Sequence, residues 1–451
     1  MQEPLRSNVT TWLEAPSWLW TAVVVGAAAL GVIAVLLPLV YVVAILVGLV
    51  VTALIFWQPA IGAGIYVFMV YSRLLEYIPQ LQEFRIMLLL SSLLGVSVFL
   101  RSLLTKDGWW FGGVIRNVIF IGAAAAASVP LAVWKSNSFD MFAEFVKVIV
   151  GVILVANSIR TEKQLVWFLR LLALMFFWIS MTVIWNYLTG NVTTPGEIRR
   201  AKGIGAMLAD ANDIAAVLLM LASVAIYGIR YDTAIAARLA YLAFLPIGMV
   251  ALVYTGSRGG FLGLVWLLLI LVLTSSRRML LMALGVILLI VVWFAAPPSW
   301  RERMLSIKEY QQDESAMARI HLWNAAKEMV KHNPITGIGI GNFEDFAASY
   351  GARSWQVAHN TYYHILGETG LLGLAAFVAY LLSIWRFAFT RSMRTASDQS
   401  QWLARGIGMG YLVYALPIYF LSVAYYSHTY LPAAILAAGQ RLQRIPQREE
   451  V

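Results

Sequence analysis

The feature that most constrains this chain is a succession of apolar runs, each about as long as a membrane-spanning helix. The runs fall near residues 18–36, 38–57, 59–77, 86–104, 111–134, 142–158, 164–188, 213–229, 238–254, 260–275, 279–297, 362–388 and 404–424, with a weaker one near 427–440. A helix needs about 20 apolar residues to cross a bilayer, and backbone in lipid must satisfy its own hydrogen bonds. We therefore predict an all-α polytopic integral membrane protein with about 12–14 transmembrane helices.

Composition supports a membrane protein and excludes several other classes. Of the residues, 61% are hydrophobic and 12% charged, whereas a soluble domain carries about 25% charged residues. The sequence contains no cysteine, which excludes disulfides, thiolate metal sites and a cysteine nucleophile. The net charge of +10 could suggest nucleic-acid binding, but much of the excess lies in short segments between apolar runs. Positive charge there retains loops in the cytoplasm, so we expect no nucleic-acid partner.

The first sixteen residues lack features of a cleavable signal peptide, and we expect the first span to remain as an anchor.

Basic residues also predict the orientation of the spans. They mark alternate connections at Arg101 and Lys106, Arg160 and Lys163, Arg230 and Arg238, Arg277 and Arg278, Arg386, Arg391 and Arg394, and the tail residues Arg441, Arg444 and Arg448. Placing all of these in the cytoplasm leaves three external segments, 189–212, 255–260 and 298–361. The third is the one long segment between spans, and its spacing predicts an amphipathic helix from Ser315 to His332. A long ordered loop is usually functional.

The external segments carry arginines that oppose the positive-inside bias. They are Arg199, Arg200, Arg258, Arg301, Arg303, Arg319 and Arg353. Cations near the bilayer are costly and usually functional, and the planar guanidinium binds phosphate oxygens with two bonds. A diphosphate between lipid and sugar would lie at this depth. The alternative is that these arginines reach to the interface or pair with Glu197, Asp210 or Glu302. At Arg258 the flanking glycines, which allow close approach, favour a functional role.

The segment 333–373 contains the most specific pattern. Its glycine run, Gly337-x-Gly339-x-Gly341, could suggest dinucleotide binding but lacks the full motif and a βαβ context. The alternative is a flexible turn that lets the loop fold back. His359 directly precedes an apolar run, where it could take a proton from a hydroxyl near neutral pH or make a structural hydrogen bond.

Two further residues of this segment support His359 in our interpretation. His364 lies five residues after His359, a spacing that does not favour a two-histidine metal site, so we predict no metal. His364 and Glu368 are four apart, and we expect them to pair on one helix face and orient the helix that follows His359.

Four ordered blocks resemble the O-antigen ligase and polymerase superfamily. They are Arg200-Ala-Lys-Gly203 with Asp210-Ala-Asn212-Asp213-Ile214-Ala215; Thr255-Gly-Ser-Arg258-Gly259; Arg319-Ile-His-Leu-Trp323 with Asn333-Pro334 and Gly337-x-Gly339-x-Gly341-Asn342-Phe343; and His359-Asn360-Thr361-Tyr362 with Glu368-x-Gly370. The resemblance covers residues 190–385. Ala211 departs from the pattern, because relatives often carry proline there.

The resemblance implies a metal-independent, inverting glycosyltransferase without a cofactor. Residues 1–188 would be N-terminal transmembrane helices, and 189–451 the catalytic region with the periplasmic loop 298–361. The resemblance implies that His359 activates the acceptor hydroxyl as general base, or holds it in place, while Arg200, Arg258 and Arg319 bind the donor diphosphate. Asn212, Asn360, Glu368, Gly339 and Gly341 would support the site.

The implied donor is a glycan on undecaprenyl diphosphate, used at the periplasmic face of a bacterial inner membrane. The acceptor decides between the remaining alternatives. A lipid A–core acceptor would make the protein an O-antigen ligase, our first prediction, and a second lipid-linked glycan would make it an O-antigen or exopolysaccharide polymerase. A protein acceptor, or transport of the lipid-linked glycan without reaction, ranks below these two. A transporter would show paired inverted repeats, whereas the motifs here lie in the second half alone.

Overall fold

The computed structural model describes residues 39–77, 85–105, 108–193, 199–203, 210–305, 314–353, 355–389 and 397–444. The chain divides into two compact units, Met1–Gln58 and Pro59–Val451. The described part of the first unit is one apolar helix, α2 (Leu39–Trp57), with most of its side chains exposed, as suits a helix facing lipid. The predicted run near 18–36 lies outside the described residues.

The second unit contains helices where the apolar runs predict them. They are α3 (Pro59–Ser72), α4 (Ile86–Thr105), α5 (Val114–Ser128), α6 (Lys135–Ser158), α7 (Glu162–Leu188), α8 (Ala211–Tyr231), α9 (Ile235–Tyr254), α10 (Arg258–Thr274), α11 (Arg278–Ala295) and α15 (Thr361–Ala388). Among the described residues of the whole chain, seven helices are long and apolar enough to cross a membrane, and four shorter apolar helices accompany them. The prediction of an all-α polytopic membrane protein is confirmed.

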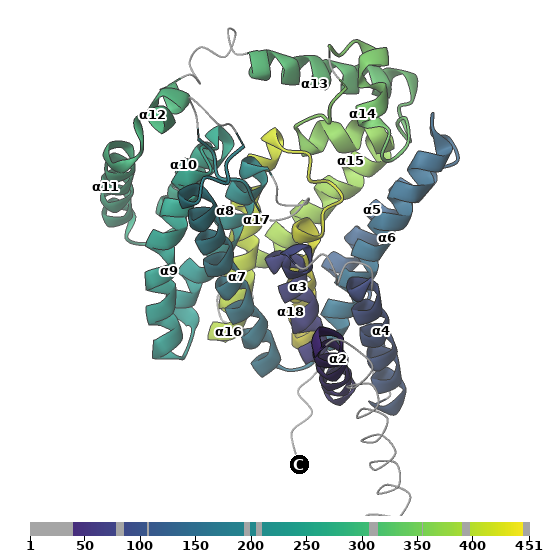
Figure 1. Ribbon diagram of the computed structural model, residues 1–451, viewed down its shortest axis with the longest axis vertical. Coiled ribbons are helices and arrows are strands. Elements are labelled where there is room, and N and C mark those ends of the chain that lie inside the picture. The colour runs from purple at the N-terminus through teal and green to yellow at the C-terminus, as the bar shows by residue number, and fades with distance from the viewer. Residues whose placement is uncertain are drawn as a thin grey trace, which may run out of the picture. The chain divides into compact units, whose positions relative to one another are not determined.

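Packing within this unit places α8 at its centre. In α8, 78% of the most apolar 18-residue stretch is buried within the protein, whereas in α11 the buried share is 11%. Helices α7, α8 and α9 pack against one another, and α10 joins α8 to α11 (Figure 1). Because α8 contacts protein on most sides, its apolar side chains form core, whereas the apolar face of α11 suits lipid.

The long segment before α15 is ordered into short helices where it is described. It contains α12 (Pro298–Leu305), α13 (Glu314–His332), α14 (Phe343–Phe346) and a 3₁₀ turn, η4 (Ala347–Tyr350). The predicted helix from Ser315 to His332 is confirmed within one residue. Leu322, Met329 and Ile338 are buried together in a local core, and Figure 1 shows α13 lying crosswise to the bundle of α7, α8 and α9.

The last apolar runs do not form one straight helix. They comprise α16 (Asp398–Trp402), a π-helical turn η6 (Leu403–Ile407), α17 (Gly408–Tyr414), a 3₁₀ turn η7 (Pro417–Phe420) and α18 (Ser427–Arg444). Residues 421–426 between η7 and α18 are not helical. Buried hydroxyls satisfy nearby carbonyls: Tyr380 and Tyr411 both donate to Thr429 O, at 2.9 and 2.6 Å. Irregular backbone is tolerated at this depth because protein surrounds it.

Candidate active site

The geometry of the site begins with a break in α15 at Gly370. The backbone there has φ 65° and ψ −161°, which no α-helix contains. The segment that follows α13 lies beside the break and forms backbone hydrogen bonds with it. Ile338 N donates to Gly367 O at 3.0 Å and Gly339 N to Glu368 O at 2.9 Å, while Leu371 N donates to Pro334 O at 2.9 Å. The groups that the break would leave unsatisfied therefore bond to the 334–339 segment, which fixes α13 against α15.

The glycine run is required by close packing. A Cβ on Gly337 would come within 2.5 Å of the Glu368 carbonyl carbon, and one on Gly339 within 2.3 Å of Ala132 Cβ. Both glycines have positive φ, as does Gly341, a conformation that side chains disfavour. Of the two alternatives that the sequence left open, the fold agrees with a segment that turns back on the membrane helices. The segment has no βαβ context in the described residues.

The end of α5 and the first turn of α6 bind the other side of this segment. Asn137 Nδ2 donates to Gly341 O at 2.8 Å and to Asn342 Oδ1 at 3.1 Å. Ile340 N donates to Ser128 Oγ at 3.1 Å. Sequence reasoning missed Asn137 and Ser128, because they lie about two hundred residues away and no local pattern marks them.

His359 is held by backbone contacts on both sides. Its own φ is 47°, a left-handed value that is uncommon for residues other than glycine and often found at functional positions. Before it, Trp323 Nε1 of α13 donates to Ala358 O at 3.0 Å. After it, Asn360 caps α15, since its side chain accepts from Tyr362 N and Tyr363 N at 3.0 and 3.1 Å.

Thr361 adds a third anchor to the histidine. Its hydroxyl donates to Leu421 O at 2.6 Å and accepts from Val423 N at 3.2 Å. The non-helical segment 421–426 is thereby tied to the first residue of α15. The sequence predicted the role of Asn360 as support, but gave no signal for Trp323 or Thr361 as anchors.

The environment of His359 keeps its imidazole neutral. Burial lowers the pKa of His359 to about 4, and the nearby Arg319 guanidinium adds to the effect. Arg319 lies one helical turn before Trp323 on α13, so the Trp323 bond to Ala358 brings both side chains toward His359. A neutral imidazole can accept a proton near pH 7, which a protonated one cannot.

Arg200 and Arg258 form the second part of the site. Arg200 Nε donates to Thr255 O at 3.1 Å, which attaches the 199–203 segment to the turn that opens α10. Burial lowers the pKa of Arg200, Asp210 opposes that shift, and Arg258 adds to it. The two guanidinium groups thus lie close together, with one carboxylate near them: Asp210 Oδ1 is 3.8 Å from Arg200 Nη2. Asp210 also acts electrostatically on His359, so both parts face one region.

The turn that carries Arg258 is fixed by Asn212. Ser257 caps α10 by accepting from Gly260 N at 3.0 Å, and its hydroxyl donates to Asn212 Oδ1 at 2.8 Å. Arg258 is the first residue of α10, where a cation opposes the helix dipole. An anion placed there would be attracted by both the guanidinium and the helix terminus. At the departure from the family pattern, Ala211 opens α8 under an Asp210 cap, so no proline is needed to start that helix.

Arg199 and Arg200 point to different partners. Arg199 lies over the ring of Tyr187, 5.5 Å from its centroid, and Tyr187 stacks on Tyr254. Arg200 contacts the Thr255 turn. The structure therefore brings Arg200 together with Arg258, and His359 together with Arg319. Glu368 lies on the broken helix α15, whereas Gly339 and Gly341 lie on the segment that pairs with it.

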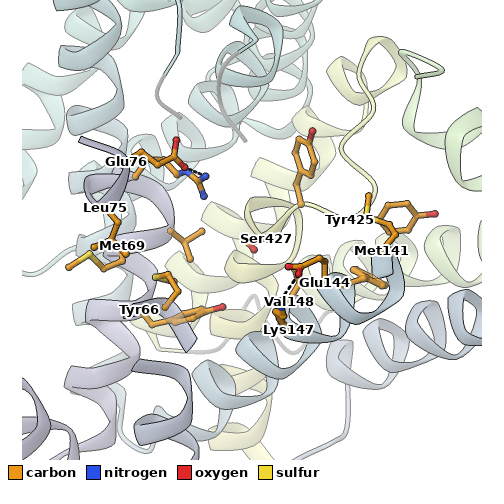
Figure 2. A pocket seen from close by; sticks show the side chains of 15 residues that line it. Tyr66, Met69, Leu75, Glu76, Met141, Glu144, Lys147, Val148, Tyr425 and Ser427 are labelled. Atoms are coloured by element: carbon orange, nitrogen blue, oxygen red, sulfur yellow. Dashed lines mark hydrogen bonds and ion pairs between the residues drawn. The ribbon is translucent and has the colours of Figure 1, made fainter. Parts of the chain in front are cut away.

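Two pockets adjoin the site region, one with charged residues in its lining and one apolar. One, of about 410 Å³, lies between α3 and α6 and ends at Tyr425; Figure 2 shows Tyr66 and Met69 on one side and Met141 and Glu144 on the other. The second, of about 310 Å³, has an entirely apolar lining from α7 to α11. It includes Leu252, which lies three residues before the Thr255 turn.

His364 and Glu368 form the predicted pair. His364 Nε2 lies 3.1 Å from Glu368 Oε1, and the same oxygen accepts from Phe343 N at 3.0 Å. The pair therefore links α15 to the start of α14. Among the described residues, no group of three or more His, Cys, Asp or Glu is arranged to hold a metal ion.

Comparison with known proteins identifies the region that contains these residues. A sequence model of the O-antigen ligase family matches residues 241–378, which include Arg258, Arg319 and His359. A search of curated proteins found no match. The match supports an O-antigen ligase or polymerase type of membrane glycosyltransferase. Residues 241–378 of the chain are therefore similar to the O-antigen ligase family, in agreement with the resemblance of the four sequence blocks.

Proposed function

We propose that this protein is an O-antigen ligase that transfers a glycan from undecaprenyl diphosphate to a hydroxyl of lipid A–core. The reaction would take place at the periplasmic face of a bacterial inner membrane. The observation that carries the proposal is that a partly buried His359 lies near Arg319, and that Asp210, which is 3.8 Å from Arg200, acts electrostatically on both His359 and Arg200. In this arrangement His359 can accept a proton, and the arginines can bind a ligand with several negative charges.

The arginine pair suits the donor's diphosphate. Two guanidinium groups near the start of α10 can bind phosphate oxygens with paired, charge-assisted bonds. The site is partly shielded from water, which strengthens such bonds. The apolar pocket of about 310 Å³ near Leu252 offers a place for part of the donor's lipid chain. A lipid with its diphosphate at the start of α10 and its hydrocarbon chain in this pocket would use both the arginine pair and the pocket.

The chemistry follows from these positions. His359 would take the proton of the acceptor hydroxyl as its oxygen bonds to the anomeric carbon. The bond from that carbon to the diphosphate would break, and Arg200, Arg258 and Arg319 would stabilise the charge that develops on the leaving group. A diphosphate leaves readily, so we propose a metal-independent reaction. A single displacement inverts the anomeric centre.

A transfer assay tests the function. Purified protein is mixed with a lipid-linked glycan and either lipid A–core or a second lipid-linked glycan. We expect glycan on lipid A–core in the wild-type reaction and at least about 100-fold less product with His359→Ala. A matched control is His332→Ala, which removes an exposed histidine at the end of α13.

The same assay separates the acceptor alternatives. Longer lipid-linked chains without lipid A–core product would replace the ligase proposal with a polymerase. No product with either acceptor, from wild type and His359→Ala alike, would contradict the enzyme proposal.

A further inference from the structure

Four aromatic side chains form a connected row between the start of α10 and the loop that carries His359. We call Phe420, Tyr419, Trp323 and Tyr363 the aromatic row; the first two belong to η7, the third to α13 and the fourth to α15. The ring centroids are 5.5 Å apart for Phe420 and Tyr419, 5.3 Å for Tyr419 and Trp323, and 5.7 Å for Trp323 and Tyr363. At these distances each ring contacts the next.

One end of the aromatic row packs on the turn that carries Arg258. A Cβ on Gly259 would lie 3.4 Å from Phe420 Cδ2, so the Phe420 ring lies against the backbone of the residue that follows Arg258. The short turn η7 also contacts α8 and α15 as well as α10. The row therefore begins beside a residue to which the proposed function assigns the donor diphosphate.

The other end of the aromatic row is joined to the backbone on both sides of His359. Trp323 Nε1 donates to Ala358 O at 3.0 Å, which holds the indole ring at the residue before the histidine. The chain that leaves η7 is attached on the other side, because the Thr361 hydroxyl donates to Leu421 O at 2.6 Å. The aromatic row thus extends from the proposed diphosphate site to the proposed base.

The rings of the aromatic row are not core residues. Tyr419 is 37% exposed, and the other three residues of the row are half-buried. By contrast, Tyr411 and Tyr414, in the helix just before η7, are fully buried, and their hydroxyls lie 2.6 and 3.1 Å from oxygen atoms of Thr429. Those two tyrosines are satisfied inside the protein, whereas the row presents aromatic surface that the protein leaves uncovered.

The proposed reaction requires a sugar in the region that the aromatic row spans. In a single displacement the anomeric carbon lies between the leaving diphosphate and the attacking oxygen, so the first sugar of the donor lies between Arg258 and His359. The faces of a pyranose ring carry C–H groups, which pack favourably on the electron-rich face of an aromatic ring. We infer that the aromatic row binds the first sugar of the lipid-linked donor, chiefly through Tyr419 and Phe420. This inference rests on the proposed function.

Such a contact would complete what the arginines cannot do alone. A bound diphosphate fixes one end of the sugar, but the single bonds between phosphorus, oxygen and the anomeric carbon still rotate. A flat aromatic surface restricts that rotation and presents the anomeric carbon to a hydroxyl held at His359. A sugar hydroxyl directed at the rings would lose hydrogen bonds to water without replacement, so the row also favours sugars with an apolar face.

A pair of ligands separates sugar binding from diphosphate binding. Affinity is measured with detergent-solubilised protein for undecaprenyl diphosphate and for undecaprenyl diphosphate that carries a glycan. In Tyr419→Leu an apolar side chain replaces the ring. We expect affinity for the glycan-bearing lipid to fall about 3- to 10-fold, as for loss of one aromatic contact. Affinity for the sugar-free lipid should stay at the wild-type value.

Three further variants complete the design. Phe420→Leu is a second test variant and should show the same pattern as Tyr419→Leu. Tyr419→Phe keeps the ring and removes only the hydroxyl, so it should bind both lipids like the wild type. Trp355→Leu removes a 63% exposed aromatic side chain outside the row and should also leave both affinities unchanged.

The outcomes separate this inference from the proposed function. Wild-type affinity for the glycan-bearing lipid in folded Tyr419→Leu and Phe420→Leu would overturn the inference alone. Equal losses for the two lipids would also overturn it, because aromatic side chains that only anchor η7 at the membrane interface predict that result. A raised KM for the acceptor with unchanged donor affinity would overturn it in favour of acceptor binding. If the wild-type protein binds neither lipid, the proposed function itself fails.

Discussion

The two halves of the site differ in how the chain builds them. The arginine half, near α8 and α10, is held largely by side chains, Arg200 to Thr255 O and Ser257 to Asn212, with a backbone bond from Ala201 N to Tyr254 O at 3.0 Å. The histidine half, at the start of α15, is held by backbone pairing through a broken helix and by Trp323. Long guanidinium side chains can adjust to a polyanion, whereas the backbone pairing fixes the position of one imidazole.

We infer from this difference that the arginine half binds the donor and the histidine half transfers the proton. Electrostatic attraction falls slowly with distance, so the arginine half tolerates small movements. Proton transfer requires hydrogen-bond distance, so the histidine half does not. Changes to the arginine half should therefore lower donor affinity in steps, while changes to the histidine half should affect folding or turnover.

The largest effect is expected at Gly337. Its Cβ would meet the Glu368 and Gly367 backbone at 2.5 Å, and backbone cannot move aside as a flexible side chain can. We expect Gly337→Ala to destabilise the fold by at least about 3 kcal/mol. Thermal unfolding in detergent would measure the loss.

Gly351→Ala is the matched control for Gly337. Gly351 also has positive φ, but a Cβ there would meet nothing within 4 Å. We expect a cost of only about 1 kcal/mol. Equal losses at the two positions would show that the break in α15 is not closely packed.

Arg258→Lys should have the next largest effect. Lysine keeps the charge but loses the planar fork, so donor affinity should fall about 10- to 100-fold, while the fold remains intact. Binding of the lipid-linked donor to detergent-solubilised protein would measure this. Arg199→Lys, on the Tyr187 face, should stay near wild-type affinity; a loss there equal to that at Arg258 would contradict the assignment of Arg200 to the site.

A smaller effect is expected at Trp323. Trp323→Phe removes the bond to Ala358 O but keeps an aromatic ring beside Tyr363, which stacks on it at 5.7 Å. Loss of one hydrogen bond costs roughly 0.5–1.5 kcal/mol, so turnover should fall about 2- to 10-fold with unchanged donor affinity. If donor affinity falls and turnover does not, the histidine half does not act on turnover separately from donor binding by the arginine half.

The smallest change is expected between pH 5 and 8. Because the pKa of His359 is lowered to about 4, the base becomes protonated only as pH falls through that value. The acceptor kcat/KM, which reports groups of the free enzyme, should stay level across this range and fall below pH 5. Half-loss near pH 6.5 would indicate a histidine with an ordinary pKa and would contradict its burial beside Arg319.

Much of the fold could be predicted from the sequence because each span is marked by its own apolar residues. The predicted runs 86–104 and 238–254 differ from α4 and α9 by three residues or fewer at each end. The break in α15 was not predicted, since the run 362–388 is apolar enough to be interpreted as one continuous span. It depends on pairing with the 334–339 segment, which local periodicity does not record.

The candidate site divides in the same way. Arg200, Arg258 and His359 were predicted because charge on an external segment and a motif are visible in sequence. Trp323, Thr361 and Asn137 were not predicted as anchors, because each acts through a contact with a distant carbonyl. A single sequence carries no signal for such pairs.

The most direct test of the account is a comparison of donor affinity and single-turnover transfer in His359→Gln. The glutamine can hydrogen-bond to an acceptor hydroxyl but cannot take its proton. We predict wild-type affinity for the lipid-linked donor and a transfer rate at least about 100-fold lower. Wild-type transfer in this variant would contradict the role of His359 as the base.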